Sequence, residues 1–257
     1  MPTKGFTTTG SRRTSFYDPE LSTTYSTSSL WRDCPILEHK FDPSIGVLLE
    51  ENFCSYNAAA TTGDYTLTAA TTGSAAISTT IIGTLAIDSG ATTAAQGVNL
   101  QRLKAMFIPA AGKDIWAEFR ISLTATTPPV TKGQIYVGLA ASDTTIIASG
   151  SQSTNNRIGW QIETAGLLQM TFTSDKAGTA TTKTGPLLVA ATAVRLGFRY
   201  DGTADTVQQY INGATSGTAV ATANIPKLAM YPSFVCQSDG TDEPILNVHG
   251  YRIFQYR

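Results

Sequence analysis

The chain has 257 residues, of which 42% are hydrophobic and 14% charged, and its formal net charge at pH 7 is −1. A chain of this length can bury a substantial core. Its near-neutral charge excludes an overall field that would attract nucleic acid or an anionic membrane. We find neither an apolar run long enough to span a bilayer nor a signal-peptide pattern. Threonine makes up about one residue in six, and its branched side chain favours strands.

Residues 1–45 differ from the rest, because their apolar residues are large and isolated and follow no strand or helix period. A purely disordered tail would contain fewer aromatic residues. We therefore predict an extended N-terminal arm that binds a partner through anchor side chains and through backbone pairing with a sheet edge. The alternative is that the arm folds back over its own domain. The predicted anchors are Phe6, Phe16, Tyr17, Tyr25, Leu30 and Trp31.

The segment from Pro35 to Pro43 reads as a connection, and residues 46–257 read as a single β-sandwich domain. Short segments with the period-2 alternation of strands recur there between turn residues, and no segment shows a persuasive amphipathic helix. The predicted strands are Gly46–Phe53, Tyr65–Ala69, Ala75–Thr79, Gly83–Ile87, Val98–Leu103, Ile115–Leu123, Gln134–Ala140, Arg157–Glu163, Leu168–Thr173, Ala193–Tyr200, Val207–Ile211, Tyr231–Cys236 and Leu246–Phe254.

Two hairpins are especially clear in this pattern. The strand that ends at Tyr200 is followed by Asp201-Gly202, and the next strand stops at Asn212-Gly213. Both dipeptides tolerate the positive φ angles of tight hairpin turns. Ala165-Gly166 similarly separates two alternating segments. Regular short strands joined by such turns predict an all-β antiparallel sandwich or barrel.

The acidic residues do not form an evident catalytic pair. A glycosidase on this scaffold needs two carboxylates about 5–10 Å apart across a cleft. Glu118 and Glu163 each stand alone on a predicted strand, and Glu50-Glu51 are adjacent and would point to opposite faces. Only a cross-strand pairing of Glu118 with Glu163 would allow hydrolysis. We expect surface carboxylates and no enzyme activity.

The sequence also contains few residues that could form a metal site or a catalytic triad. His39 and His249 are the only histidines, which excludes a His-rich metal site and disfavours a Ser-His-Asp triad. Acidic loops at Asp201–Asn212 and Asp239–Glu243 could offer oxygen ligands to calcium, but turn formation explains these residues equally well. We predict no catalytic residue, no cofactor and no metal site.

The cysteines and the aromatic residues are the remaining candidate functional groups of the chain. Cys34, Cys54 and Cys236 are widely spaced and odd in number, so we predict free thiols rather than a disulfide framework. Several aromatic residues could line a sugar-binding platform if they faced outward on one sheet; otherwise they belong to the core or to assembly contacts. These residues are Trp116, Tyr136, Trp160, Tyr200, Tyr210 and Tyr231.

The part from Ile115 to Arg257 resembles the concanavalin A-like (laminin-G-like) jelly-roll domains of tailed-phage structural proteins. The resemblance covers a little over half of the chain and rests on packing and turn motifs. The chain departs from two branches of this family, because it lacks the paired acidic strand of the glycosidases and a clear metal-ligand loop of the legume lectins. The resembling segments are Trp116–Ile121, Gln134–Leu139, Leu196–Asp201, the strand ending at Tyr210–Gly213, and Val248–Gln255.

The resemblance, together with the arm and the neutral Thr/Ala-rich surface, implies a non-enzymatic virion protein, a capsid decoration (cement) protein. We expect it to be made in the host cytoplasm, to sit on the particle surface, and to bind the major capsid protein or other virion subunits. We also expect a homo-oligomer, for example a trimer, and no nucleic-acid or membrane partner. The alternatives are a lectin-like module that binds a surface glycan and, less favoured, a glycosidase.

Overall fold

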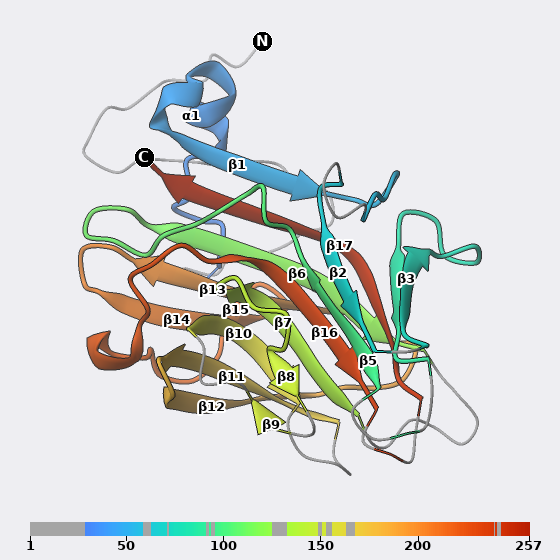
Figure 1. Cartoon of the computed structure of the whole chain (residues 1–257). Coiled ribbons are helices and arrows are strands. Elements are labelled where there is room, and N and C mark those ends of the chain that lie inside the picture. Colours follow the sequence, from blue (N-terminus) through green and yellow to red (C-terminus); the bar gives the residue numbers. More distant parts are fainter. Residues whose placement is uncertain are drawn as a thin grey trace.

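The computed structural model describes residues 29–58, 63–70, 72–90, 93, 96–124, 133–148, 151–152, 156–162, 168–238, 240 and 243–257. Within these residues, two antiparallel β-sheets pack face to face (Figure 1). The predicted antiparallel β-sandwich is therefore confirmed. None of the described helices is long and apolar enough to cross a membrane.

The first sheet, sheet A, contains eight of the described strands. The long strand β17 organises it, because β6 pairs along one side of β17 while β4 and β1 pair in succession along the other. In spatial order its strands are β15 (Ala214–Thr215), β14 (Thr206–Ile211), β13 (Val194–Asp201), β6 (Ile115–Leu123), β17 (Ile245–Tyr256), β4 (Leu85–Asp88) and β3 (Ser74–Ile77), with β1 (Gly46–Glu51) on β17.

The second sheet, sheet B, contains seven of the described strands. In spatial order they are β12 (Thr179–Leu187), β11 (Gln169–Lys176), β10 (Arg157–Ile162), β7 (Gln134–Ala140), β16 (Tyr231–Gln237), β5 (Gly97–Gln101) and β2 (Thr66–Ala69). A separate small hairpin and three short helices complete the described elements. They are β8 (Ile147–Ala148), β9 (Ser151–Gln152), α1 (Ile36–Phe41), η2 (Pro43–Ile45) and η3 (Thr222–Asn224).

Two of the three predicted hairpin turns fall in the described residues, while Ala165-Gly166 lies outside them. The turn between β13 and β14 spans residues 202–205 and has its positive φ, 52°, at Asp205 rather than at Asp201-Gly202. The carboxylate of Asp201 accepts the backbone N–H groups of Thr203 and Ala204 at 2.8 and 2.9 Å, which shapes the turn between β13 and β14. Asn212 and Gly213 have φ angles of 51° and 82°, the paired positive values of a tight turn, and they join β14 to β15.

Among the described elements, the sequence pattern missed the strands β8, β9, β12 and β15 and the short helices α1, η2 and η3. The edge strand β12 reads TATTKTGPL, which lacks apolar alternation because an edge strand needs no deeply buried face and because Gly185 and Pro186 suggest a loop. The six-residue helix α1 lies in the predicted connection, and it is too short to show an amphipathic period.

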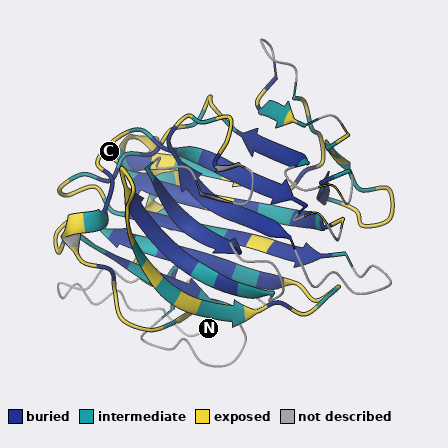
Figure 2. Ribbon diagram, turned by 60° about the horizontal axis from the view of Figure 1, so that its bottom comes forward, coloured by how far each residue is buried: buried dark blue, intermediate teal, exposed yellow. Residues whose placement is uncertain are grey.

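The core lies between the two sheets and is rich in aromatic residues. Phe119 of sheet A contacts Phe234 of sheet B with ring centres 5.9 Å apart, and Phe198 contacts Phe172 at 6.0 Å. Aromatic pairs of this kind add to the stabilisation by apolar burial. Figure 2 shows the buried residues along the central strands, with exposed residues mainly in connecting loops and near the edges.

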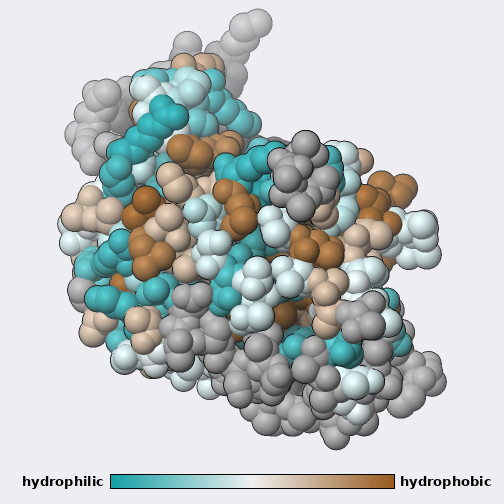
Figure 3. Space-filling model, viewed as in Figure 1, coloured by the Kyte–Doolittle hydropathy of each residue, from teal (hydrophilic) through white to brown (hydrophobic). Residues whose placement is uncertain are grey.

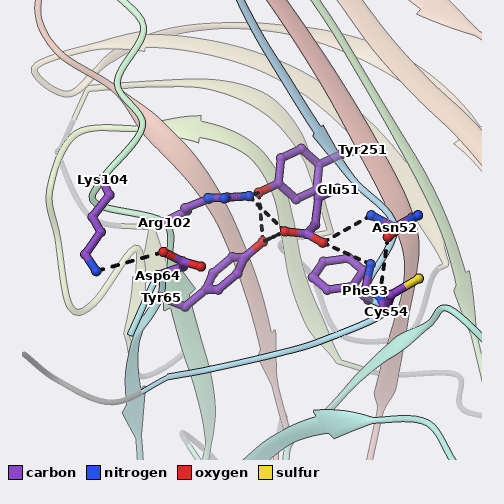
Figure 4. A network of polar contacts seen from close by, with 9 residues as sticks. All are labelled: Glu51, Asn52, Phe53, Cys54, Asp64, Tyr65, Arg102, Lys104 and Tyr251. Carbon is purple, nitrogen blue, oxygen red and sulfur yellow. Dashed lines mark hydrogen bonds and ion pairs between the residues drawn. The ribbon is translucent and has the colours of Figure 1, made fainter. Parts of the chain in front are cut away.

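A polar network ties the two sheets together beside this core (Figure 4). The guanidinium of Arg102, which follows β5, donates to Glu51 of β1 at 2.8 Å and to the hydroxyl of Tyr251 at 3.2 Å. The hydroxyls of Tyr65 and Tyr251 share a hydrogen bond of 2.8 Å. Burial raises the pKa of Tyr251 to about 12 and also raises the pKa of Tyr65, so both hydroxyls stay protonated at neutral pH. The network therefore has a structural role: it holds the two sheets together.

Candidate functional site

The aromatic residues considered for a sugar platform do not form one. Trp160 and Tyr200 belong to the core between the sheets, and the indole N–H of Trp160 donates to the carbonyl of Gly197 at 3.3 Å. Trp116 and Tyr210 lie in a separate cluster on the outer face of sheet A, the face turned away from sheet B. The remaining two are Tyr136, which is buried, and Tyr231, which is half-buried.

The outer face of sheet B is partly covered by the segment from Ala141 to Ile146. Gln101 of β5 donates to the carbonyl of Ala141 at 3.0 Å and accepts the N–H of Asp143 at 2.8 Å. Ile146 packs with Tyr136 of β7 in a small apolar cluster. The described residues therefore leave Tyr136 covered rather than open to a ligand.

Asp175 is the only acidic residue on the described strands of sheet B, and it is ion-paired. The guanidinium of Arg157 contacts its carboxylate at 3.0 Å, and both side chains are less than 5% exposed. A buried pair of this kind contributes little net stability but costs much to break. Asp175 thus has no described carboxylate beside it on this sheet with which to act as an acid–base pair.

Glu118 lies on the outer face of sheet A, where it alternates with the core residues Ala117 and Phe119. Glu163 lies outside the described residues, and Ile162, the residue before it, ends β10 of sheet B. Glu118, one of the two carboxylates considered as a catalytic pair, thus faces away from the sheet that contains β10.

Residues 29–34 attach to the outer face of sheet A. The N–H of Leu30 donates to the carbonyl of Gly213 at 3.0 Å, and Ser29 forms a β-bridge with Ala214 of the edge strand β15. The side chain of Leu30 is 1% exposed and lies over Gly197, where an added Cβ would come within 2.6 Å of it. A side-chain anchor and backbone pairing therefore act together, on the chain's own domain.

Further contacts hold the same segment in place. Cys34 is buried with Leu30 in a cluster that contains Trp116, Tyr210 and Phe254. The carboxylate of Asp33 lies 3.7 Å from the guanidinium of Arg199. Residues 29–45 thus pack over the sandwich that was predicted to begin at Gly46, and for them the structure shows the alternative in which the arm folds back on its own domain.

The other predicted anchors have different outcomes. Trp31 is half-buried, and the guanidinium of Arg252 lies over its ring, 5.6 Å from the ring centre. Phe6, Phe16, Tyr17 and Tyr25 lie outside the described residues.

A polar hollow of about 630 Å³ lies on the outer face of sheet A. Strand register explains its charges, because Glu50, Arg252 and Glu118 stand opposite one another across three neighbouring strands. Two residues beyond Glu118 along β6, Arg120 stands directly opposite Arg195 of β13. Among its lining residues are Glu50, Glu118, Arg120, Arg195, His249 and Arg252.

His249 lines the hollow and also a neighbouring one of about 520 Å³. Its two ring nitrogens lie 2.8 Å from the hydroxyl of Ser122 and 3.0 Å from the hydroxyl of Thr84. Burial, and then the nearby charge of Arg120, lower the pKa of His249 below its ordinary value of 6.5. The neutral imidazole suits this environment, since it can donate to one hydroxyl and accept from the other.

The acidic loops considered for calcium serve turns and ion pairs where the structure describes them. Besides the turn contacts of Asp201, Asp205 accepts from the hydroxyl of Tyr200 at 3.0 Å and pairs with Lys227, and Asn212 accepts the N–H of Arg195 at 3.0 Å. Within the described residues, no three His, Cys, Asp or Glu side chains are grouped to hold a metal ion. Asp239 and Asp242 lie outside the described residues.

The three cysteines are free thiols, as predicted. Cys34 and Cys236 are buried, and burial raises the pKa of Cys236 to about 12. Cys54 is exposed. Since the two buried thiols stay protonated, they are poor nucleophiles.

Sequence reasoning missed Arg120 and Arg195 as a pair. Each alternates with core residues along its own strand, so the sequence could indicate that both point outward. Their direct opposition depends on the pairing register of β6 with β13, whose strands are about 75 residues apart in the sequence, and no local pattern reports that register.

Comparisons with known proteins support the fold but come from structures alone. No protein-family model matches the chain, and none of the curated proteins matches it. A peanut lectin structure with a bound 9-residue peptide is similar at a TM-score of 0.57 and 13% identity, covering 82% of this chain and 97% of the lectin. A Lotus tetragonolobus seed lectin is similar at a TM-score of 0.58 and 10% identity, covering 82% of this chain and 99% of the lectin.

Enzymes share the same architecture. A β-glucanase of Bacillus licheniformis is similar at a TM-score of 0.55 and 10% identity, covering 82% of this chain and 98% of the enzyme. At such low identity the likeness concerns the fold alone. The chain is a concanavalin A-like jelly-roll sandwich, a fold that lectins and glucanases share.

Proposed function

We propose that this chain is a non-enzymatic virion structural protein, a capsid decoration (cement) protein that binds neighbouring subunits through its sandwich and through residues 1–28. The observation that supports this proposal most is the attachment of residues 29–34. This segment is held on sheet A by the buried side chain of Leu30, which packs over Gly197, and by backbone pairing with the edge strand β15. Residues 1–28 carry further large aromatic anchors, which suit the same mode of binding on a neighbouring subunit.

The placement of the acidic residues supports a role without catalysis. Asp175 is buried and paired with Arg157, and Glu118 faces away from the sheet that contains β10. A retaining or inverting glycosidase needs two carboxylates that face one cleft. The described residues provide no such pair on sheet B.

The partners that fit are the major capsid protein or another virion subunit, and sister copies in a homo-oligomer such as a trimer. Many modest contacts, repeated by the symmetry of a particle, would together resist its expansion. The net charge of −1 suits protein partners rather than nucleic acid. The proposed location is the particle surface, after synthesis in the host cytoplasm.

The test compares the full chain with a shortened chain that begins at Ser29. The shortened chain keeps Leu30 and its contacts, so we expect it to retain its thermal midpoint. We expect it to lose mass in multi-angle light scattering, or to lose binding to capsids that lack the protein. Unchanged mass together with unchanged capsid binding would exclude an arm function for residues 1–28.

A lectin-like, carbohydrate-binding role is the second candidate, and the polar hollow on sheet A favours it. Its volume of about 630 Å³ lies within the usual range of about 300–1,000 Å³ for ligand sites. Its lining is rich in groups that donate and accept hydrogen bonds, as sugar hydroxyls require. A glycan-array screen of the full chain tests this role directly, and binding to no glycan at micromolar protein would oppose it.

A further inference from the structure

Arg120 and Arg195 stand directly opposite each other on β6 and β13, on the outer face of sheet A. Side chains in such positions have Cβ atoms about 4.5–5.5 Å apart, and like charges there destabilise a sheet. Apart from the backbone pairing of β6, the side chain of Arg120 makes no hydrogen bond or ion pair with another described residue. Arg195 is tied to Asn212, since its guanidinium donates to the Asn212 carbonyl at 3.4 Å.

The neighbouring carboxylates do not neutralise this pair fully. Glu50 is ion-paired with Arg252, and Glu51 is ion-paired with Arg102 at 2.8 Å. Glu118, opposite Arg252, is the third carboxylate of the described lining, and its single negative charge is fewer than the two positive charges of Arg120 and Arg195. The local charge around Arg120 and Arg195 is positive, in a chain whose overall charge is −1.

The space beside the pair is open because a bulge and a glycine border it. The register of β17 with β6 shifts between Val248 and Gly250, and Gly250 stands opposite Arg120. Gly250 has a φ of 146°, a value that side chains rarely adopt, and an added Cβ would come within 2.7 Å of the carbonyl oxygen of Glu51, so no side chain projects from this position of β17. A ligand atom could therefore approach the Arg120 guanidinium from the side of β17.

The remaining lining indicates the kind of ligand. Guanidinium forks match planar oxyanions such as carboxylates. Around them lie the amide side chains of Asn52 and Asn212 and the imidazole of His249, while the ring of Tyr251 packs in the core and Ala193 is left as the apolar side chain of the described lining. A peptide anchor would need a larger apolar pocket than this one residue provides.

We propose that this hollow binds an acidic saccharide, with its carboxylate on Arg120 and Arg195 and its hydroxyls on the surrounding amide and carboxylate groups. This proposal deepens the carbohydrate-binding candidate function and rests on it. It assigns the site to the outer face of sheet A rather than to sheet B, and it explains why two arginines are kept opposed at a cost in stability.

Isothermal titration calorimetry tests the site with D-glucuronate as the probe. We expect saturable binding that weakens as salt is raised, and a loss of at least about tenfold in Arg120→Gln and in Arg195→Gln, because hydrogen bonds to a charged group are removed. The matched control Arg257→Gln, at the exposed C-terminal residue, should bind as the wild type does. Glucuronate binding that is unchanged in both hollow variants, or absent in the wild type, would overturn the site.

Three further probes separate the sources of binding. D-glucose should bind at least about tenfold more weakly than glucuronate, and acetate and inorganic sulfate should do the same because they lack the hydroxyls. Equal affinity for acetate would overturn the saccharide assignment. Neutral-glycan binding that persists in Arg120→Gln would overturn this site while leaving the carbohydrate-binding function in place.

Thermal unfolding without ligand gives an independent readout. Arg120→Gln should raise the midpoint by about 1–3 °C, because it removes a like-charge contact. It should also abolish the upward shift that glucuronate produces in the wild type. A lowered midpoint in Arg120→Gln would show that Arg120 serves the fold, and it would count against the proposal.

Discussion

At the scale of single residues, Gly197 allows close packing on both faces of sheet A. Trp160 reaches across the core to its carbonyl, and Leu30 lies on its other side. An added Cβ would also meet the carbonyl oxygen of Ala117 at 2.9 Å. The missing side chain thus lets the N-terminal segment approach sheet A closely.

Leu30→Ala should show what this contact contributes. Leu30 is almost fully buried, and removing such a side chain leaves a cavity that costs about 2–5 kcal/mol. We expect urea denaturation to report a loss in this range, or proteolysis to report release of residues 29–45 at an unchanged midpoint. Leu187→Ala is the matched control, because Leu187 is 61% exposed and its loss should cost less than about 0.5 kcal/mol. Equal effects of the two variants would mean that Leu30 is not an anchor.

His249 should make stability depend on pH within a narrow window. Its pKa is lowered in the folded chain, so the unfolded chain takes up a proton first as pH falls. Stability is then constant above about pH 6.5 and declines as pH falls from there through the folded-state pKa. Thermal midpoints of His249→Asn between pH 7 and 5 should decline less than those of the wild type. A decline in His249→Asn as steep as in the wild type would exclude this assignment.

At the scale of elements, some elements depend on consecutive residues and others depend on contacts with distant parts of the chain. The turns of the β13–β14 and β14–β15 hairpins depend on a few consecutive residues, Asp201 and Asn212-Gly213 among them, and could be predicted. The edge strand β12 and the helix α1 could not, because they depend on pairing with β11 and on packing over sheet A.

The segment formed by residues 29–45 behaves as an element of the sandwich, which leads to a prediction about truncation. A chain that begins at Gly46 would lose Leu30 and Cys34 and would expose Trp116 and Phe254. We expect it to be less stable than the chain that begins at Ser29 by about 3–6 kcal/mol, the cost of exposing two or three buried apolar side chains. Urea denaturation and binding of a hydrophobic dye would measure this difference, and equal stability of the two chains would contradict it.

At the scale of the whole molecule, the sandwich leaves its two outer faces in different states. On sheet B, the segment from Ala141 to Ile146 covers part of the face. On sheet A, residues 29–45 cover one end and leave the polar hollow beside them. Elsewhere the exposed apolar residues are dispersed, and on the face seen in Figure 3 they form separate groups between hydrophilic ones.

The candidate site illustrates the limit of sequence reasoning at this scale. Glu118 and His249 were considered from the sequence, but as possible catalytic groups and without Arg120 or Arg195 beside them. Alternation along β6 and β13 indicates which side chains point outward. It does not indicate which of them meet, because neighbouring strands come from distant parts of the chain.

The sequence by itself determined the fold class, most of the strands, the free thiols and the tight turn at Asn212-Gly213, since alternation and turn chemistry act over a few residues. Only the tertiary structure decided that Leu30 packs on Gly197, that Glu118 faces away from sheet B, and that Arg120 opposes Arg195. The physical reason is that side-chain burial and cross-strand register arise from the packing of segments far apart in the chain, where many arrangements satisfy the same local pattern.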